Sequence, residues 1–172
     1  MGTMHAVGPH THLSDMELDC WSPKCEKCAD TAGMAPDDPD YWRDHPNPTD
    51  EELHELCEAW LTYQREDHGD GVDETDPNWW AVEAAMDAES ELERICRVIR
   101  GLCEIAAPDD PAVEMIGAGP LESMFFQYGD TAMDLVEPAA EENATLLAAL
   151  RHVWAFDEPV RPRIDRFLLR LS

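Results

Sequence analysis

Residues 92–110, LERICRVIRGLCEIAAPDD, decide the fold, because their apolar side chains recur every three or four positions. That spacing places them on one face of an α-helix. The same rhythm begins further upstream, so we expect one continuous helix from residue 77 or 78 to about residue 107, ended by Pro108. Burial of each large side chain contributes about 1.5–3 kcal/mol before entropy is subtracted, which favours a central position for this helix. Gly101 inside it indicates either close packing or a break.

Residues 49–64, TDEELHELCEAWLTYQ, predict a second amphipathic helix. Thr49 can cap its N-terminus, and Glu52 follows three positions later, as a capping box requires. Leucine, cysteine and tryptophan side chains share one face of this helix, and most of its glutamates fall on the other face.

The C-terminal half predicts shorter helices separated by turns. VEMIGAGPLESMFFQYGD, residues 113–130, indicates a short helix that ends at Ile116, a Gly-Ala-Gly turn, and a new helix that begins at Pro120. The expected boundaries after this turn are Gly129 as a helix end, and Asp130 and Asn143 as the caps of the next two helices. A last amphipathic segment covers residues 158–172.

Successive helices with short connections predict an all-α fold, either a compact multi-helix bundle or a short HEAT-like helical stack. We place this acidic helical domain at residues 50–172. Residues 1–49 contain few aliphatic side chains, several prolines and no sustained periodicity. They are therefore expected to form an irregular leader that does not fold by apolar burial.

The leader contains a cysteine motif, CWSPKCEKC, in which Cys20, Cys25 and Cys28 have C-x4-C-x2-C spacing. The C-x2-C half allows two thiolates to bind one tetrahedral zinc ion, and His12 is the expected fourth ligand, with His10 close by. Such a Zn²⁺ clip would be closed and structural. The alternative is a mobile tail with free thiols. The remaining cysteines lie on apolar helix faces and are expected in the core: Cys57, Cys96 and Cys103.

Charge is the most pronounced feature of the composition. The 172 residues include 38 Asp and Glu against 12 Lys and Arg, a formal net charge of −26. Residues 50–93 hold 16 of the acids and a single base, Arg65. A field of this sign repels nucleic acid and anionic lipid and accelerates encounter with basic proteins. We therefore expect no direct nucleic-acid binding and no membrane binding. The alternative is that the acidity serves solubility or salt adaptation.

The cellular location follows from what the N-terminal stretch lacks. No run of about 18 apolar residues is present to cross a bilayer. The opening MGTMHAVGPHTHLSD has neither the basic nor the apolar part of a secretory signal. We expect a cytoplasmic protein.

The acidic segment also carries tryptophans, which anchor protein interfaces when they are exposed and framed by charge. The predicted partner-binding residues are Glu51, Glu55, Glu58, Asp70, Asp73, Glu74, Asp76, Trp79 and Trp80. The alternative is that these two rings, together with Tyr41 and Trp42, close one end of the helical core.

Several stretches of the chain resemble a bacterial family of domains of unknown function: NWWAVEAAMD, LERICRVIRGLCEIAAPDD, VEMIGAGPLESMFFQYGD and LLAALRHVW. The family is marked by an I-G-A-G-P-L-E turn, here at residues 116–122, and the resemblance covers about residues 50–157. Members often have a histidine where this chain has Tyr128. The resemblance implies a fold and no activity.

No nucleophile or general base stands in a recognisable motif, so no catalytic residue is predicted. We expect a non-enzymatic monomer or homodimer that binds a basic or nucleic-acid-binding protein as an inhibitor, immunity, adaptor or counter-defence module. Two alternatives stay open. One is a DNA mimic that inhibits a phage-defence enzyme, since carboxylates along helices can follow a phosphate track. The other is a zinc-dependent hydrolase with an open metal position.

Overall fold

The computed structural model describes residues 41–42, 48–66, 72–88, 91–154 and 160–171. Every regular element in these ranges is helical, which confirms the predicted all-α fold. The elements are α2 (Asp50–Arg65), α3 (Trp79–Ala88), α4 (Leu92–Ile105), α5 (Val113–Ile116), η2 (Gly117–Leu121), α6 (Glu122–Tyr128), α7 (Asp130–Glu142), α8 (Ala144–Leu150) and α9 (Arg161–Arg170). Among these described helices, none combines the length and the apolar character needed to span a membrane.

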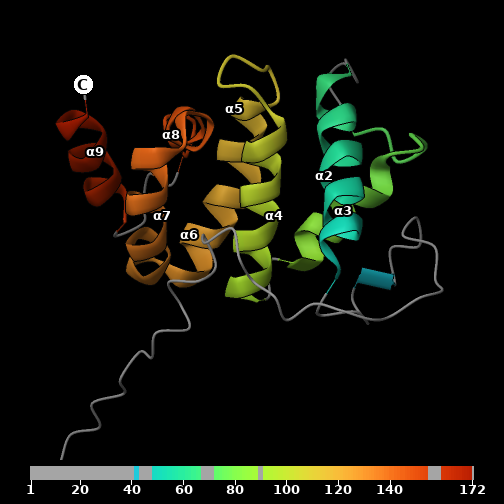
Figure 1. Ribbon diagram of the computed structural model, residues 1–172, viewed down its shortest axis with the longest axis horizontal. Helices are drawn as coiled ribbons and strands as arrows, with labels where there is room; N and C mark the ends of the chain where they lie inside the picture. The colour runs from blue at the N-terminus through green and yellow to red at the C-terminus, as the bar shows by residue number, and fades with distance from the viewer. Residues whose placement is uncertain (1–40, 43–47, 67–71, 89–90, 155–159, 172) are drawn as a thin grey trace, which may run out of the picture.

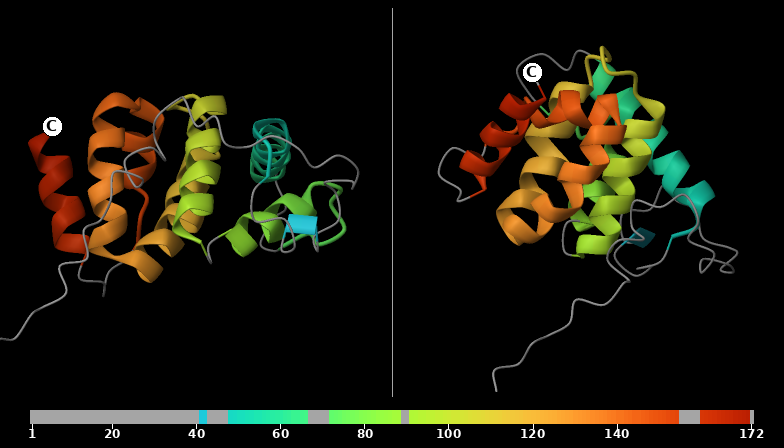
Figure 2. Two further views of the ribbon diagram at one scale, coloured as in Figure 1. Left: turned by 60° about the horizontal axis from the view of Figure 1, so that its bottom comes forward. Right: turned by 60° about the vertical axis from the view of Figure 1, so that its left-hand side comes forward.

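The helices are arranged along the long axis of the molecule, from α2 and α3 at one end to α9 at the other (Figure 1). Figure 2 shows the same order from two further directions, with α4 in the middle of the row. α4 contacts α2, α3, α5, η2, α6 and α8. The segment with the strongest apolar periodicity is thus the central helix, as predicted.

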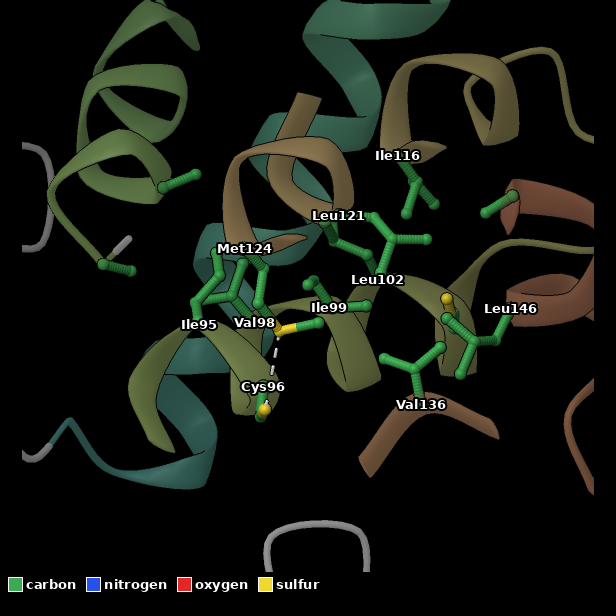
Figure 3. Packing of buried hydrophobic residues seen from close by; sticks show 14 of the residues in the cluster. Ile95, Cys96, Val98, Ile99, Leu102, Ile116, Leu121, Met124, Val136 and Leu146 are labelled. Atoms are coloured by element: carbon green, nitrogen blue, oxygen red, sulfur yellow. Dashed lines mark hydrogen bonds between the residues drawn. The ribbon is translucent and has the colours of Figure 1, made fainter. Parts of the chain in front are cut away.

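The core is built around α4, whose Ile95, Ile99 and Leu102 are completely buried. Figure 3 shows Ile99 and Leu102 close to Leu121 and Met124, which come from η2 and α6. Two sulfur atoms also meet here, since the Sγ of Cys96 lies 3.7 Å from the Sδ of Met124. Cys57, Cys96 and Cys103 are all buried, which confirms their predicted place in the core.

The capping box of α2 is formed as predicted. The backbone N–H of Glu52 donates to the Thr49 hydroxyl at 3.2 Å, and the backbone N–H of Thr49 donates to the Glu52 carboxylate at 2.6 Å. Leu53, Leu56 and Trp60 lie on the face of α2 that is buried in the core, and most of its glutamates lie on the other face. The cap fixes where α2 begins and therefore which face carries its glutamates.

The prediction of one continuous helix over residues 77–107 is wrong, because the chain breaks between α3 and α4. A straight helix of that length would extend roughly 45 Å, whereas α2, with 16 residues, extends only about 24 Å. Both α3 and α4 pack on α2. The break allows the alanine face of α3 and the isoleucine face of α4 to be buried against the same shorter helix.

Gly101 lies within α4, so the helix does not break there. A Cβ atom at this position would lie 2.8 Å from the Sγ of Cys57. Of the two interpretations that the sequence allowed, close packing between α2 and α4 is the one observed.

The predicted Gly-Ala-Gly turn is also wrong. Residues 117–121 form a π-helical segment that joins α5 to α6 in one continuous rod. Pro120 lies inside this segment and has no N–H to donate. The wider π-helical spacing appears in the bond from the Glu122 N–H to the Gly117 carbonyl, five residues back. A π-bulge is one way to keep a proline within a helix without ending it.

The later helix boundaries are confirmed with one exception. Gly129 ends α6 with φ of 51°, a left-handed conformation that favours glycine. Asn143 caps α8 by accepting the Leu146 N–H at 2.9 Å. Asp130, in contrast, makes no capping hydrogen bond. It is the first residue of α7, and its carboxylate lies 3.5 Å from Arg163 on α9.

Candidate functional site

The outer face of α2 is acidic. Glu51, Glu55 and Glu58 are exposed along one side of the helix, opposite its buried stripe. We call these three residues the acidic ridge. Within the described ranges, no arginine or lysine pairs with them, and the Glu58 carboxylate lies 3.4 Å from the Nε2 of the exposed His54. The ridge therefore presents uncompensated negative charge to solvent.

The acidic residues that follow α2 are partly used to build the turn before α3. Asp73 accepts hydrogen bonds from the Thr75 N–H at 2.9 Å and from its hydroxyl at 2.6 Å. Asp76 accepts the Asn78 N–H at 2.6 Å. Glu74 is exposed in this turn, whereas Asp70 lies outside the described residues. Two of these predicted partner-binding carboxylates thus shape the backbone as well as the surface charge.

Trp79 and Trp80 are half-buried, and both rings pack against other aromatic residues. Trp80 stacks on Trp42 with ring centroids 6.2 Å apart, and Trp79 lies 5.5 Å from the ring of Tyr63. Part of each tryptophan ring is therefore covered by another aromatic ring, and only the rest is open to a partner. They join α3 to α2 and to the segment before α2.

Tyr41 and Trp42 are 2% and 1% exposed, so they belong to the core. The Tyr41 hydroxyl donates to the Glu52 carboxylate, and the Arg94 guanidinium donates to the Trp42 carbonyl. The hydrogen bond to Glu52 is the largest cause, and burial the second, of a rise in the pKa of Tyr41 to about 12. For Tyr41 and Trp42, the structure agrees with the alternative interpretation of the sequence, in which aromatic residues close one end of the core.

Acids at the far end of the molecule pair with arginines, unlike those of the acidic ridge. Arg163 of α9 lies 2.7 Å from Asp134 and 2.9 Å from Glu137 of α7, in addition to its contact with Asp130. The hydrogen bond to Glu137, and after it the one to Asp134, raise the pKa of Arg163 above its usual value. Arg170 pairs with Glu141 at 2.7 Å. At this end, arginines of α9 therefore offset part of the negative charge of α7.

The core thiols are poor nucleophiles. Burial raises the pKa of Cys57 and of Cys103 from 9.0 to about 12, and the charge of Glu104 adds to the effect for both. At neutral pH both sulfurs therefore hold their protons. The Cys57 thiol donates to the Val98 carbonyl at 3.6 Å. These residues serve packing and offer no reactive thiolate.

The predicted zinc ligands Cys20, Cys25, Cys28 and His12 all lie outside the described residues. Within the described ranges, no group of three or more His, Cys, Asp or Glu side chains is arranged to hold a metal ion. The zinc clip therefore stays a prediction from the sequence.

A family model matches residues 68–170, more than half of the chain. The chain belongs to DUF6869, a family of unknown function. The matched segment contains α3 to α9, so the broken helix pair, the π-helical segment and the α7–α9 ion pairs all lie within the DUF6869 region. α2 and its acidic ridge precede that region. No curated protein and no solved structure matches the chain.

The sequence-based resemblance to a family of unknown function is thereby confirmed. The matched segment begins and ends later than the 50–157 expected from the sequence. DUF6869 is a family of unknown function, so it assigns no activity to this chain. Any role of the acidic ridge is therefore argued from the structure of this chain.

Proposed function

We propose that this protein is a non-enzymatic cytoplasmic binding module that docks a basic or nucleic-acid-binding protein on the acidic ridge and thereby inhibits or neutralises it. The observation that supports this most is the contrast between the two ends of the molecule. Glu51, Glu55 and Glu58 have no arginine partner within the described ranges, whereas Arg163 and Arg170 pair with Asp134, Glu137 and Glu141 of α7. Charge left uncompensated on an ordered helix is available to a partner.

The physical role of the ridge would be steering and selection. A net charge of −26 creates a long-range field that raises the encounter rate with cationic proteins. Glu51, Glu55 and Glu58 recur at intervals of four and three residues, so their carboxylates follow one side of α2. A partner with basic side chains at a similar spacing would match them. Individual exposed ion pairs contribute little, so binding would depend on several acting together.

The thiols and the histidine considered next favour a binding function over a catalytic one. The buried thiols of Cys57 and Cys103 hold their protons, and His54 lies beside a carboxylate on an exposed surface. A nucleophilic mechanism requires an activated nucleophile next to a base, and these described groups do not supply one.

The test compares two triple variants that each remove three negative charges. Glu51→Gln, Glu55→Gln and Glu58→Gln together remove the ridge. Asp109→Asn, Glu114→Gln and Glu142→Gln remove three other exposed acids and form the matched control. Proteins that the wild type retains from a host extract at low salt are identified, and the Kd of each candidate is then measured with all three purified proteins.

The proposal expects a partner whose affinity drops at least about tenfold in the ridge variant, drops much less in the control, and falls steeply as salt rises from about 0.05 to 0.5 M. Equal affinity of the ridge variant and the wild type would overturn it. Competition by duplex DNA for the same partner surface would identify the partner as a nucleic-acid-binding protein.

A further inference from the structure

A groove of ≈ 370 Å³ lies between α2 and α4, next to the acidic ridge. α2 contributes Asp50, Leu53 and His54 to its lining. The residues from α4 are Arg97, Arg100, Gly101, Glu104 and Ile105. The volume lies within the range of sites that accept a small ligand or a single large side chain.

The groove combines two aliphatic side chains with charged side chains that pair with one another. Leu53 is buried and Ile105 is half-buried, and both pack on the core cluster. Gly101 adds only backbone atoms to the lining, because the Cys57 thiol occupies the place that a side chain would take. The apolar part of the lining favours an aliphatic group over an ion.

The two arginines that line the groove are held by neighbouring acids. Arg97 pairs with Asp50 at 3.1 Å and also donates to the Pro48 carbonyl at 2.9 Å, while Arg100 lies 3.6 Å from Glu104. Each positive charge therefore has a negative charge close by. An anion entering the groove would compete with Asp50 and Glu104 for the same guanidinium groups, which disfavours an anion-binding site.

His54 connects the groove to the ridge, since it lines the groove and also lies 3.4 Å from Glu58. A segment that pairs with the ridge and also crosses His54 would bring a side chain to the groove. The spacing of Glu51, Glu55 and Glu58 corresponds to steps of about 6 and 4.5 Å along the helix axis. Lysines or arginines on a helix repeat with the same steps, so a basic helix fits the ridge better than an irregular chain.

We infer that the α2–α4 groove receives one aliphatic side chain from a Lys/Arg-rich helix of the partner, while the basic residues of that helix pair with the acidic ridge. The inference rests on the proposed function, because the ridge supplies the charge that orients the helix. The ridge selects a basic helix, and the groove selects among basic helices by their central apolar residue.

The experiment uses two fluorescein-labelled, lysine-rich helical peptides of about 18 residues, long enough to form helix in water. They are identical except for leucine or serine at one central position between the lysines. Binding of both peptides to the full-length protein is followed by fluorescence anisotropy. The inference expects the leucine peptide to bind about tenfold more tightly, because the free energy gained by burying a leucine side chain corresponds to a gain in affinity of about that size.

Two variants of the protein test whether the preference for leucine arises in the groove. Ile105→Gln makes the groove polar and is expected to reduce the leucine preference to less than about twofold, with the affinity for the serine peptide unchanged. Leu169→Gln, at a position 76% exposed on α9, is the control and should keep the full preference. Circular dichroism and thermal melting verify that both variants are folded. The comparison of the two peptides on wild-type protein remains informative even if Ile105→Gln is unstable.

The outcomes separate the groove from the ridge. Equal binding of the two peptides to wild-type protein, or a preference for leucine that survives Ile105→Gln in a folded variant, would overturn the groove and leave the ridge standing. Peptide binding that is unaffected by the triple glutamine variant of the ridge would overturn the proposed function itself.

Discussion

Gly101 of α4 packs directly against Cys57 of α2: a Cβ at position 101 would lie 2.8 Å from the Cys57 Sγ. The thiol occupies the space that a larger residue at 101 would need. It is buried and also donates a hydrogen bond to the Val98 carbonyl, so it has little freedom to move away. The two residues are therefore expected to be energetically coupled.

Gly101→Ala should destabilise the protein by about 1–3 kcal/mol, the usual cost of an overpacked core, despite the better helix propensity of alanine. In a Cys57→Ala background the same change should cost far less, because the obstructing sulfur is gone. The measurement is a double-mutant cycle from urea unfolding curves with a common m-value. Identical costs in both backgrounds would show that the clash does not determine the effect.

Two glycines of the π-helical segment should respond in opposite ways to the same substitution. A Cβ at Gly117 would lie 2.2 Å from the carbonyl oxygen of Ala149 and 2.8 Å from the Cβ of His152, whereas a Cβ at Gly119 would meet nothing within 4 Å. A backbone oxygen cannot move aside as a side chain can, so Gly117→Ala should cost about 3 kcal/mol or more. Gly119→Ala should be neutral or slightly stabilising. Thermal melting of the two variants checks the contrast, and similar shifts would contradict it.

The difference between these glycines shows what local sequence can and cannot predict. The start of α2 was predictable because the Thr49–Glu52 capping box lies within four residues. The exposure of Glu51, Glu55 and Glu58 followed from the same helical phase. The π-helical segment was not predictable, because the demand for glycine at 117 comes from Ala149, 32 positions away in the chain.

The same reasoning applies to the candidate site. Sequence identified the acidic segment and its tryptophans, yet the stacking of Trp80 on Trp42 depends on how two separate segments fold together. Which acids are compensated depends in turn on contacts such as that of Arg163 with Asp134, 29 positions apart. Charge counted along the chain therefore overestimates the charge that the folded surface offers to a partner. That Glu51, Glu55 and Glu58 pair with no arginine of the described ranges could be known only from the folded structure.

The buried thiols predict a loss of stability at alkaline pH. The pKa of Cys57 and of Cys103 is about 12 in the folded protein, above the value of 9.0 that an unperturbed thiol has. The unfolded state therefore releases these protons first, so the stabilisation is complete below about pH 9 and is lost as the pH rises towards 12. Unfolding free energies measured by urea at a series of pH values should decrease over this window. Cys103→Ala should make the decrease shallower, and an unchanged slope would rule out a contribution from this thiol.

The cysteine motif of the leader predicts a metal dependence that chelation can test. If Cys20, Cys25, Cys28 and His12 form a closed site, the purified protein should contain about one zinc ion that only strong chelators remove. Cys25→Ser should abolish zinc binding, whereas Cys57→Ser, which replaces a core thiol, should retain it. Elemental analysis of both proteins decides the matter. A metal content that does not change in Cys25→Ser would rule out this ligand set.

Arg163 should stabilise the docking of α9 on α7, whereas Arg166 of the same helix should not. Its guanidinium, with the side chain 24% exposed, lies within 3.5 Å of Asp130, Asp134 and Glu137, whereas Arg166 on the same helix is exposed and makes no ion pair within the described ranges. Arg163→Met leaves three carboxylates facing one another without a counter-charge, so it should cost about 1–3 kcal/mol of unfolding free energy. Arg166→Met, its matched control, should change stability by less than about 0.5 kcal/mol. Hydrogen exchange should show whether the loss is confined to α9. Equal effects of the two substitutions would mean that burial of Ile164 and Phe167 holds the helix in place and that the ion pairs contribute little.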